Sequence, residues 1–333
     1  MRSIFVNDYP DGVSRIFTED VCAVLKQAAG LEDTVYTGEA IRANPGAFRN
    51  VTCIFSTWGM VSFTEEEIEV IFPALQCVFY GAGSVQHFAR PFLNRGIKVF
   101  SAWVANAVPV AEYTVAQILL ANKGFFYTSR PYSVGDKETA YTIRKNTLGN
   151  YGVTVGLIGV GQISRLVIRL LKNFNLKVKV CSRSLTAEGA AELGVERCSL
   201  EEIFSTCQVV SNHLANNPST VGTLREAHFA SMVPYATFLN TGRGAQVVEA
   251  DLAKVLAQRP DLTAVLDVTW PEPPLPDNPF FGLPNCILTP HIAGSTGNEV
   301  QRMGKYMQEE FLAFAAGEPT RYEVTLKMLE TMA

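Results

Sequence analysis

The stretch "VTVGLIGVGQISRLVIRLL", residues 153–171, decides the fold. Its first half is an aliphatic run typical of a buried strand, and its second half carries apolar residues at helical spacing. Gly159 and Gly161 stand between the two halves, with Ser164 three residues further on. A strand, a glycine turn and a helix in this order begin a βαβ unit, which predicts a parallel sheet.

The same turn predicts a dinucleotide site. A glycine at 159 permits the tight turn, and a glycine at 161 lets the backbone approach a pyrophosphate at the helix N-terminus. Ser164 replaces the usual third Gly or Ala, which is a small departure. The motif alone leaves an ordinary glycine-rich turn as the alternative, and the further strands that follow favour the dinucleotide.

The next strand, "KVKVCSRS" at 177–184, bears on which dinucleotide binds. A carboxylate usually grips the ribose 2′-hydroxyl of NAD about 20 residues after the glycines. This chain has Ser182 and Arg183 there instead. A hydroxyl and a guanidinium suit a 2′-phosphate, so the sequence predicts NADP(H) over NAD(H), with NAD still possible. The alternative is a solvated arginine on a loop.

Short apolar runs alternate with helical patterns along most of the 333 residues, which exceeds one ordinary domain. We expect an α/β protein with two doubly wound parallel-sheet domains. One long helix is expected over residues 108–123, and the polar, Pro- and Gly-containing segment 124–148 interrupts the pattern. The expected strands are "SIFV", "VTCIF", "LQCVFY", "IKVFSAW", "VTVGLIGVG", "LKVKVCS", "CQVVSNHL", "YATFLNTG", "LTAVLDV" and "NCILTPH".

Composition excludes several function classes. The net charge of −4 gives no basic excess for a nucleic-acid backbone, and no apolar run approaches the length of a membrane span. The N-terminal "MRSIFVNDYP" lacks the pattern of a signal peptide. Seven cysteines without a CxxC pair argue against a zinc or other metal site. We therefore expect a cytoplasmic protein whose partner is a small molecule.

Three residues at the ends of successive predicted strands could form one catalytic site: Arg243, Glu272 and His291. Ligands of open α/β sheets bind beyond the carboxyl ends of the strands, where these residues would converge. Reduction of a 2-oxo acid needs a cation for the carboxylate and an acid for the carbonyl oxygen. Arg243 suits the first task, and His291 beside the Glu272 carboxylate suits the second. Taken singly, each could be an ordinary surface residue.

With these residues the sequence resembles the D-isomer-specific 2-hydroxyacid dehydrogenases, including glyoxylate/hydroxypyruvate reductases and phosphoglycerate dehydrogenases. The likeness is densest in "NAVPVAEYTVAQILL", "GLIGVGQIS", "LNTGRGAQVVEADL", "AVLDVTWPEPPLPDNPF" and "NCILTPHIAGST". The resemblance implies that Arg243 binds substrate and that Glu272 and His291 form the acid–base pair. The cofactor-binding residues that it implies, beside those of the glycine turn, are Gln162, Ile163, Thr241, Asp267 and Gly294.

The resemblance also implies a domain layout. A substrate domain with a flavodoxin-like sheet would comprise residues 1–104 and 297–333, and a Rossmann NAD(P)-binding domain would be inserted at 105–296. Backbone N–H groups of Ala82 and Gly83 would bind the substrate. Relatives are commonly homodimers, and segment 124–148 is our candidate for an exchanged arm. Val85 and Ala215 replace an aspartate and a proline usual in the family, so the two loops that carry them could differ.

The loop "STWGMVSF", residues 56–63, follows a predicted strand on the substrate side. Trp58 and Gly59 are candidate substrate contacts, and Trp103 could assist, although packing between helices explains both tryptophans equally well. If they line the site, a bulky or apolar 2-oxo acid would fit better than glyoxylate. The alternative function is a non-catalytic, dinucleotide-sensing protein resembling the corepressors built on this scaffold. Formate dehydrogenases pair the histidine with glutamine, so Glu272 argues against that reaction.

Overall fold

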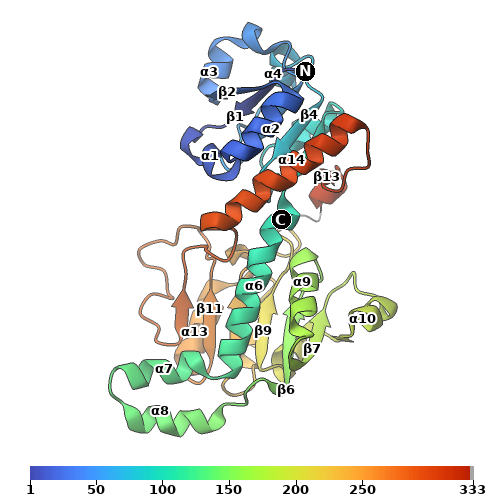
Figure 1. Ribbon diagram of the computed structural model, residues 1–333. Helices are drawn as coiled ribbons and strands as arrows, with labels where there is room; N and C mark the ends of the chain where they lie inside the picture. The colour runs from blue at the N-terminus through green and yellow to red at the C-terminus, as the bar shows by residue number, and fades with distance from the viewer. Residues whose placement is uncertain (331–333) are drawn as a thin grey trace. The chain divides into compact units, whose positions relative to one another are not determined.

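Two parallel sheets, one in each of two units of the chain, organise the computed structural model, which describes residues 1–330 (Figure 1). Unit 1 consists of residues 1–107 and those from 295 onward, and unit 2 is Val108–Gly294. The boundaries expected from the sequence, after residues 104 and 296, lie three and two residues away. The predicted fold class, α/β with two doubly wound sheets, is confirmed.

The sheet of unit 1 has the strand order β13-β5-β4-β3-β1-β2. Strands β1 to β5 are parallel and lie in the flavodoxin-like order 2-1-3-4-5. The sequence analysis missed β2, whose charged residues hide its alternation, and β13, a two-residue strand antiparallel to β5. The strands are β1 Ser3–Val6, β2 Leu31–Tyr36, β3 Cys53–Ser56, β4 Cys77–Tyr80, β5 Lys98–Ser101 and β13 Glu323–Val324.

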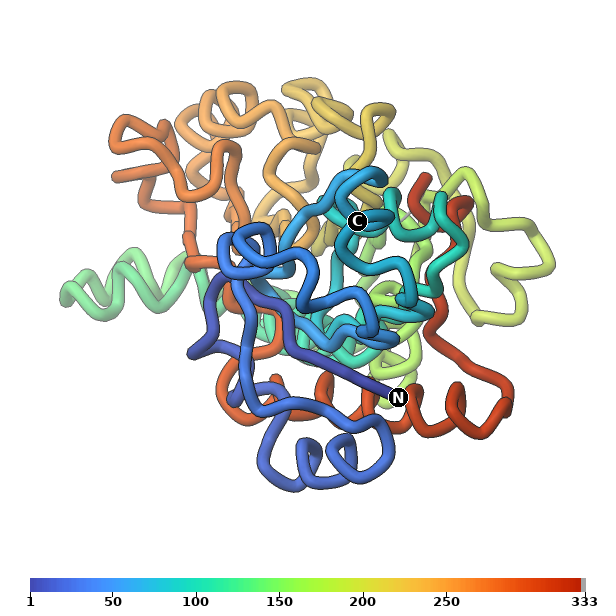
Figure 2. Tube along the Cα trace, turned by 90° about the horizontal axis from the view of Figure 1, so that it is seen from above, coloured from blue at the N-terminus to red at the C-terminus, as the bar shows by residue number. Residues whose placement is uncertain are grey.

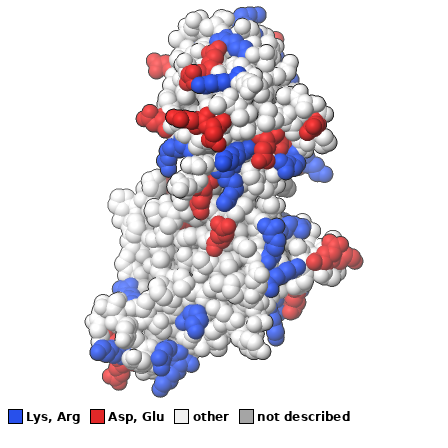
Figure 3. All heavy atoms as spheres, in the orientation of Figure 1, with Lys and Arg blue, Asp and Glu red and all other residues white. Residues whose placement is uncertain are grey.

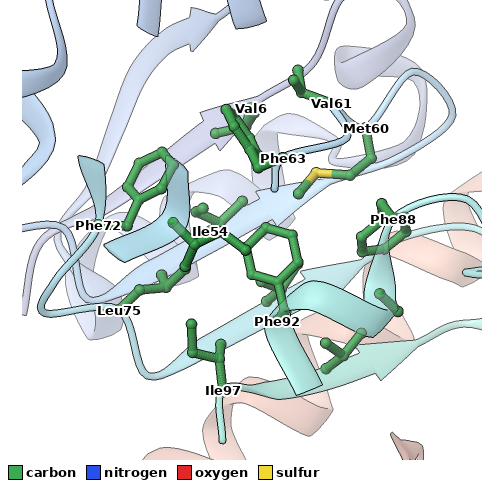
Figure 4. Close-up of a cluster of buried hydrophobic side chains, with 14 of the residues drawn as sticks. Val6, Ile54, Met60, Val61, Phe63, Phe72, Leu75, Phe88, Phe92 and Ile97 are labelled. Atoms are coloured by element: carbon green, nitrogen blue, oxygen red, sulfur yellow. The ribbon is translucent and has the colours of Figure 1, made fainter. Parts of the chain in front are cut away.

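Alternate residues of these strands enter two different cores, because successive side chains of a strand point to opposite faces. Ile54 and Val78 join the cluster drawn in Figure 4, with Phe92 of α5 across from them. Phe55 and Phe79 stack in the other cluster, on the opposite face. Both faces of the sheet are therefore covered, as parallel sheets require.

Helix α4 of unit 1 begins at a clear sequence signal. Thr64 and Glu67 form a capping box at the start of α4. The helices are α1 Val13–Ile16, α2 Glu19–Ala29, α3 Gly38–Ala43, α4 Glu65–Ile71, α5 Ala89–Asn94 and α14 Val300–Ala316, with 3-10 turns at Pro10–Gly12, Pro45–Phe48, Gly297–Glu299 and Met328–Glu330.

The sheet of unit 2 has seven parallel strands in the order β12-β11-β10-β9-β6-β7-β8. This contains the Rossmann order, with the switch point between β6 and β9. Figure 2 traces the whole chain in a view turned by 90° from that of Figure 1. The strands are β6 Tyr151–Ile158, β7 Asn175–Cys181, β8 Glu196–Arg197, β9 Val209–Asn212, β10 Thr237–Asn240, β11 Thr263–Leu266 and β12 Cys286–Leu288. The helices are α7 Phe125–Ser133, α8 Lys137–Ile143, α9 Gln162–Leu171, α10 Ala187–Leu193, α11 Leu200–Thr206, α12 Glu226–Ala230 and α13 Glu249–Gln258, with 3-10 turns at Arg144–Asn146 and Gly244–Gln246.

The long helix α6, Trp103–Asn122, runs from unit 1 into unit 2 and begins five residues before its predicted start. Among residues 1–330 it is the one helix long and apolar enough to cross a membrane by length and composition. Half of an 18-residue stretch of this helix is buried inside the structure, as is also found for helices of a protein core.

Segment 124–148, which interrupts the alternation of strands and helices in the sequence, is largely helical. It forms the helices α7 and α8, which pack as a hairpin that extends from unit 2 in Figures 1 and 2. The sequence analysis missed α7 because Pro131 lies inside it, close to its C-terminal end. The hairpin exposes several large apolar side chains, namely Phe125, Tyr132, Val134 and Tyr141.

Candidate active site

The glycine turn after β6 has the backbone conformation and close packing that a dinucleotide-binding turn requires. Gly159 has a φ of +94°, and a Cβ there would lie 2.6 Å from the carbonyl oxygen of His213, so no larger residue fits. The buried Ser164 donates a hydrogen bond to the Gly159 carbonyl at 2.8 Å. Ser164, which replaces the third glycine usual in the family, therefore stabilises the turn through a hydrogen bond from the first part of α9.

The end of α9 that faces this turn can accept a phosphate group. Gly161 precedes the helix, and a Cβ placed on it would meet no atom within 4 Å. No side chain caps the first N–H groups of the helix within the described residues, and Gln162 and Ile163 form its first turn. Open space and free donors at a helix N-terminus fit a pyrophosphate, so the residues present suit a dinucleotide.

Ser182 and Arg183 follow β7 directly. Arg183 is exposed and donates to the hydroxyl of Ser219 at 3.3 Å, while the hydroxyls of Ser182 and Ser184 lie 3.1 Å apart. No ion pair of Arg183 is recorded in the described part of the chain. The cluster therefore keeps hydroxyl and guanidinium donors available to a ligand.

Glu272 and His291 form a hydrogen-bonded pair. His291 Nδ1 lies 2.6 Å from Glu272 Oε1, and both side chains are partly exposed. Within residues 1–330 no hydrogen bond is recorded for Nε2 of His291. The carboxylate therefore orients the ring and leaves the other ring nitrogen for a ligand.

The turn that carries His291 is held by Asp267, which is buried at the end of β11. The Asp267 carboxylate accepts hydrogen bonds from the Thr289 hydroxyl at 2.6 Å and from the N–H groups of Ile292 and Ala293, both at 2.8 Å. Gly294 ends the same turn. The resemblance assigned Asp267 to the nicotinamide, and that contact stays a prediction. The observed bonds give Asp267 a positioning task that the sequence did not reveal.

The loop that carries Glu272 is held by a second carboxylate. Glu249, in the first turn of α13, accepts hydrogen bonds from the Trp270 N–H at 2.7 Å and from the Asn278 amide at 3.1 Å. Burial raises the pKa of Glu249. The sequence analysis did not select Glu249, because an acidic residue at a helix start is expected on dipole grounds alone.

Arg243 lies three residues past the end of β10 and directly before Gly244, where an added Cβ would lie 2.1 Å from the backbone of Thr269. Its guanidinium donates to the Gly242 carbonyl at 2.8 Å, and the residue is half-buried. Burial lowers the pKa of Arg243, and the charge of Glu272 partly opposes that shift. The arginine therefore lies within electrostatic reach of the Glu272–His291 pair.

A buried amide network fixes the turn around Arg243. Asn212 donates to Asn240 Oδ1 at 3.0 Å and to Gln246 Oε1 at 2.6 Å. Asn240 in turn donates to the Arg243 carbonyl at 3.2 Å and accepts from the Gly242 N–H at 3.1 Å. Thr241, predicted to contact the nicotinamide, is buried beside Thr114. The network was missed because single amides give no sequence signal.

The remaining predicted residues lie in unit 1. The N–H groups of Ala82 and Gly83 find no acceptor within residues 1–330, and Ser101 Oγ lies within hydrogen-bond distance of both of their carbonyl oxygens, at 2.9 and 2.6 Å. Trp58 and Gly59 form the turn after β3, and Trp58 is partly exposed. The indole N–H of Trp103 is buried without a hydrogen-bond partner among the described residues. Their contact with a substrate stays a prediction.

The sequence of this chain is similar to those of known dehydrogenases. The family model described as D-isomer specific 2-hydroxyacid dehydrogenase, NAD binding domain, matches residues 115–293. The chain is 30% identical over 239 residues to D-3-phosphoglycerate dehydrogenase of Archaeoglobus fulgidus, covering 71% of this chain and 44% of that protein. It is 35% identical over 166 residues to glyoxylate reductase of Aeropyrum pernix, covering half of each. The chain thus spans half or less of the length of these two relatives.

Solved structures show the same fold. The TT0316 protein from Thermus thermophilus superposes with a TM-score of 0.74 at 24% identity over 98% of this chain and 100% of the other. The apo form of Rhodotorula graminis D-mandelate dehydrogenase gives 0.78 at 21% identity over 97% of each. The matched model spans the glycine turn, Arg243, Glu272 and His291. This chain belongs to the D-isomer-specific 2-hydroxyacid dehydrogenase family.

Proposed function

We propose that this protein is an oxidoreductase that transfers a hydride between a nicotinamide dinucleotide and a 2-oxo acid, giving a D-2-hydroxy acid. The observation that carries the proposal is the 2.6 Å pairing of His291 with Glu272, with Arg243 in electrostatic reach. All three follow strand ends at the edge of the sheet where the glycine turn also lies. A binding protein would not need this set.

Each residue has a task that its surroundings support. Arg243 keeps most of its donors free after the bond to Gly242, so it can hold the substrate carboxylate and polarise the carbonyl. His291, oriented by Glu272 through Nδ1, delivers a proton to the carbonyl oxygen from Nε2. The bound dinucleotide would supply the hydride. The N–H groups of Ala82 and Gly83, which have no acceptor among residues 1–330, support their proposed role as donors to the substrate carboxylate.

The finer proposal is that NADPH is the preferred cofactor. Ser182 and the exposed Arg183 replace the carboxylate that would repel a 2′-phosphate. We also propose a cytoplasmic homodimer that associates through the α7–α8 hairpin. Its exposed aromatic side chains support the dimer, and the absence of disulfides from the described residues supports a reducing compartment. The face in Figure 3 carries lysine and arginine interspersed with aspartate and glutamate, without a continuous basic surface for nucleic acid.

A screen of 2-oxo acids with NADPH and with NADH tests the proposal. Oxidation of the cofactor is measured as the loss of absorbance of its reduced nicotinamide ring. Turnover of at least one 2-oxo acid is expected, with D-configured product. Tight dinucleotide binding without turnover of any acid would reject the dehydrogenase and favour the sensing protein. A higher kcat/KM with NADH than with NADPH would reject the cofactor preference alone.

A further inference from the structure

Two large aromatic side chains stand on adjoining loops at the carboxyl edge of the unit 1 sheet. Tyr9 follows β1 and is 72% exposed, and Trp58 follows β3 and is 45% exposed. Isolated exposed aromatics are common on proteins, but two on neighbouring loops beside a row of free backbone donors are not explained by packing.

The two loops form one hydrogen-bonded scaffold. Asn7, fully buried at the end of β1, donates to the Trp58 carbonyl at 2.9 Å and accepts from the Tyr9 N–H at 2.7 Å. The N–H of Asp8 donates to the Gly59 carbonyl at 2.9 Å. The loops after β1 and β3 are therefore positioned together rather than independently.

Gly59 brings the tyrosine ring against this scaffold. It has a φ of +100°, and a Cβ there would lie 2.6 Å from Cδ2 of Tyr9 and 2.5 Å from Oδ1 of Asn7. Only glycine allows the ring of Tyr9 to pack so closely against the turn that carries Trp58. The close approach of the Tyr9 ring to the loop that carries Trp58 thus depends on Gly59.

The scaffold continues to the turn proposed to hold the substrate carboxylate. Thr57 Oγ1 donates to the Gly81 carbonyl at 3.0 Å, and the Gly81 N–H donates to Ser56 at 2.7 Å. The free N–H groups of Ala82 and Gly83 follow at once. The aromatic pair and the carboxylate donors therefore belong to one rigid edge of unit 1.

These loops lack the charge that a phosphorylated ligand needs. The segments "NDY" at 7–9, "TWGM" at 57–60 and "GAGSVQH" at 81–87 contain no lysine or arginine, and Asp8 adds a negative charge. A phosphate on the substrate side chain would gain no cationic partner there, whereas an aromatic or branched side chain could bury apolar area against both rings.

We infer that Tyr9 and Trp58 form a side-chain subsite that selects an unphosphorylated 2-oxo acid with an aromatic or large apolar side chain. This rests on the proposed function and names its substrate class. The D-3-phosphoglycerate dehydrogenases among the relatives are named for a phosphorylated substrate, so the inference separates this chain from them.

The test compares kcat/KM for phenylpyruvate, 4-methyl-2-oxopentanoate, glyoxylate and phosphohydroxypyruvate. Phenylpyruvate is expected to exceed both glyoxylate and phosphohydroxypyruvate by roughly tenfold or more. Trp58→Ala and Tyr9→Ala should each lower kcat/KM for phenylpyruvate by about tenfold and change that for glyoxylate less than twofold. Trp58→Phe and Tyr9→Phe should retain most of the preference. Phe174→Ala, a 39% exposed aromatic that precedes β7, is the matched control.

Binding measurements keep the two proposals apart. Calorimetry of the protein with NADP⁺ compares D-phenyllactate with D-lactate, and tighter binding of the former is expected. Reduction of glyoxylate or phosphohydroxypyruvate in preference to phenylpyruvate, or equal losses for all acids in Trp58→Ala, overturns the subsite and keeps the dehydrogenase. D-Phenyllactate binding without any turnover rejects the dehydrogenase and keeps the ligand class. Neither binding nor turnover rejects both.

Discussion

Asp267 holds the backbone of His291 in place: the His291 N–H donates to the Asp267 carbonyl at 3.0 Å, and the Asp267 carboxylate binds the two residues after the histidine. His291 has a φ of +53°, a left-handed conformation that costs a non-glycine residue on the order of 1–3 kcal/mol. The hydrogen bonds around His291 must offset this unfavourable energy. The proposed proton donor therefore owes its position to a buried carboxylate.

Asp267→Asn is expected to weaken this turn. An amide offers one acceptor oxygen in place of two, so at least one of the three donors loses its partner, at a cost of about 1–3 kcal/mol. Urea unfolding should show that loss, and kcat should fall by about tenfold or more because His291 shifts. Asp277→Asn, on an exposed residue of the proline-rich loop, is the control. Wild-type stability in Asp267→Asn would refute the positioning role.

Glu272→Gln tests the acid–base pair. The amide preserves the size of the side chain and removes its charge, so the ring of His291 loses its ionic partner. We expect kcat to fall by roughly 10²–10⁴-fold, with NADPH affinity, measured by fluorescence titration, changed less than twofold. His291→Asn should reduce turnover at least as much. Full activity in either variant would remove both residues from the proposed mechanism.

Much of this site followed from the sequence because strand ends are easy to recognise. Arg243, Asp267 and His291 each end an aliphatic run, and parallel strands present such ends at one edge. The roles of Glu249 and Asn240 did not follow. Glu249 bonds the backbone of Trp270, 21 residues away, and Asn240 bonds the carbonyl of Arg243, three residues away. A bond to the backbone needs no particular partner residue that a pattern could reveal.

The missed elements have equally specific causes. The strand β2, "LEDTVY", carries two acidic residues, since its outer part is exposed at the sheet edge. The helix α7 contains Pro131, which predicts a break, yet the residue lies near the end of the helix, where few hydrogen bonds are lost. The sequence analysis did not select Tyr9, because its position beside the loop of Trp58 depends on a tertiary contact with Gly59.

Gly159→Ala should lower the stability of the protein, whereas Gly161→Ala should lower its affinity for the cofactor. At 159 the added Cβ meets the His213 carbonyl oxygen in a left-handed conformation, so the apo protein should lose about 1–3 kcal/mol of stability. At 161 the Cβ enters open space, so apo stability should stay within about 0.5 kcal/mol while NADPH affinity falls. Unfolding and binding curves of both variants check this. Unchanged affinity in Gly161→Ala would contradict pyrophosphate binding at α9.

Arg183→Gln addresses the cofactor preference. Removal of the guanidinium should raise KM for NADPH by about tenfold or more and leave KM for NADH within twofold, because only the 2′-phosphate uses the charge. Lys177→Gln, at an exposed position near the start of β7, is the matched loss of charge away from the strand end. Equal effects on the two cofactors would place Arg183 outside the 2′-phosphate site.

The lowered pKa of His213 predicts that the protein loses stability in acid. Burial lowers the pKa of His213 to about 4 from 6.5, and its Nε2 lies 2.9 Å from the Ser211 hydroxyl. Between pH 6.5 and 4, His213 is protonated in the unfolded chain and stays neutral in the folded chain. The free energy of unfolding therefore falls as the pH drops from 6.5 toward 4. The contribution is intact above pH 6.5 and amounts to at most about 3 kcal/mol. Urea unfolding of the cofactor-free protein at pH 7.5 and 4.5 should show a smaller difference in His213→Gln than in the wild type. An equal or larger difference in the variant would mean that His213 is not held neutral by its burial.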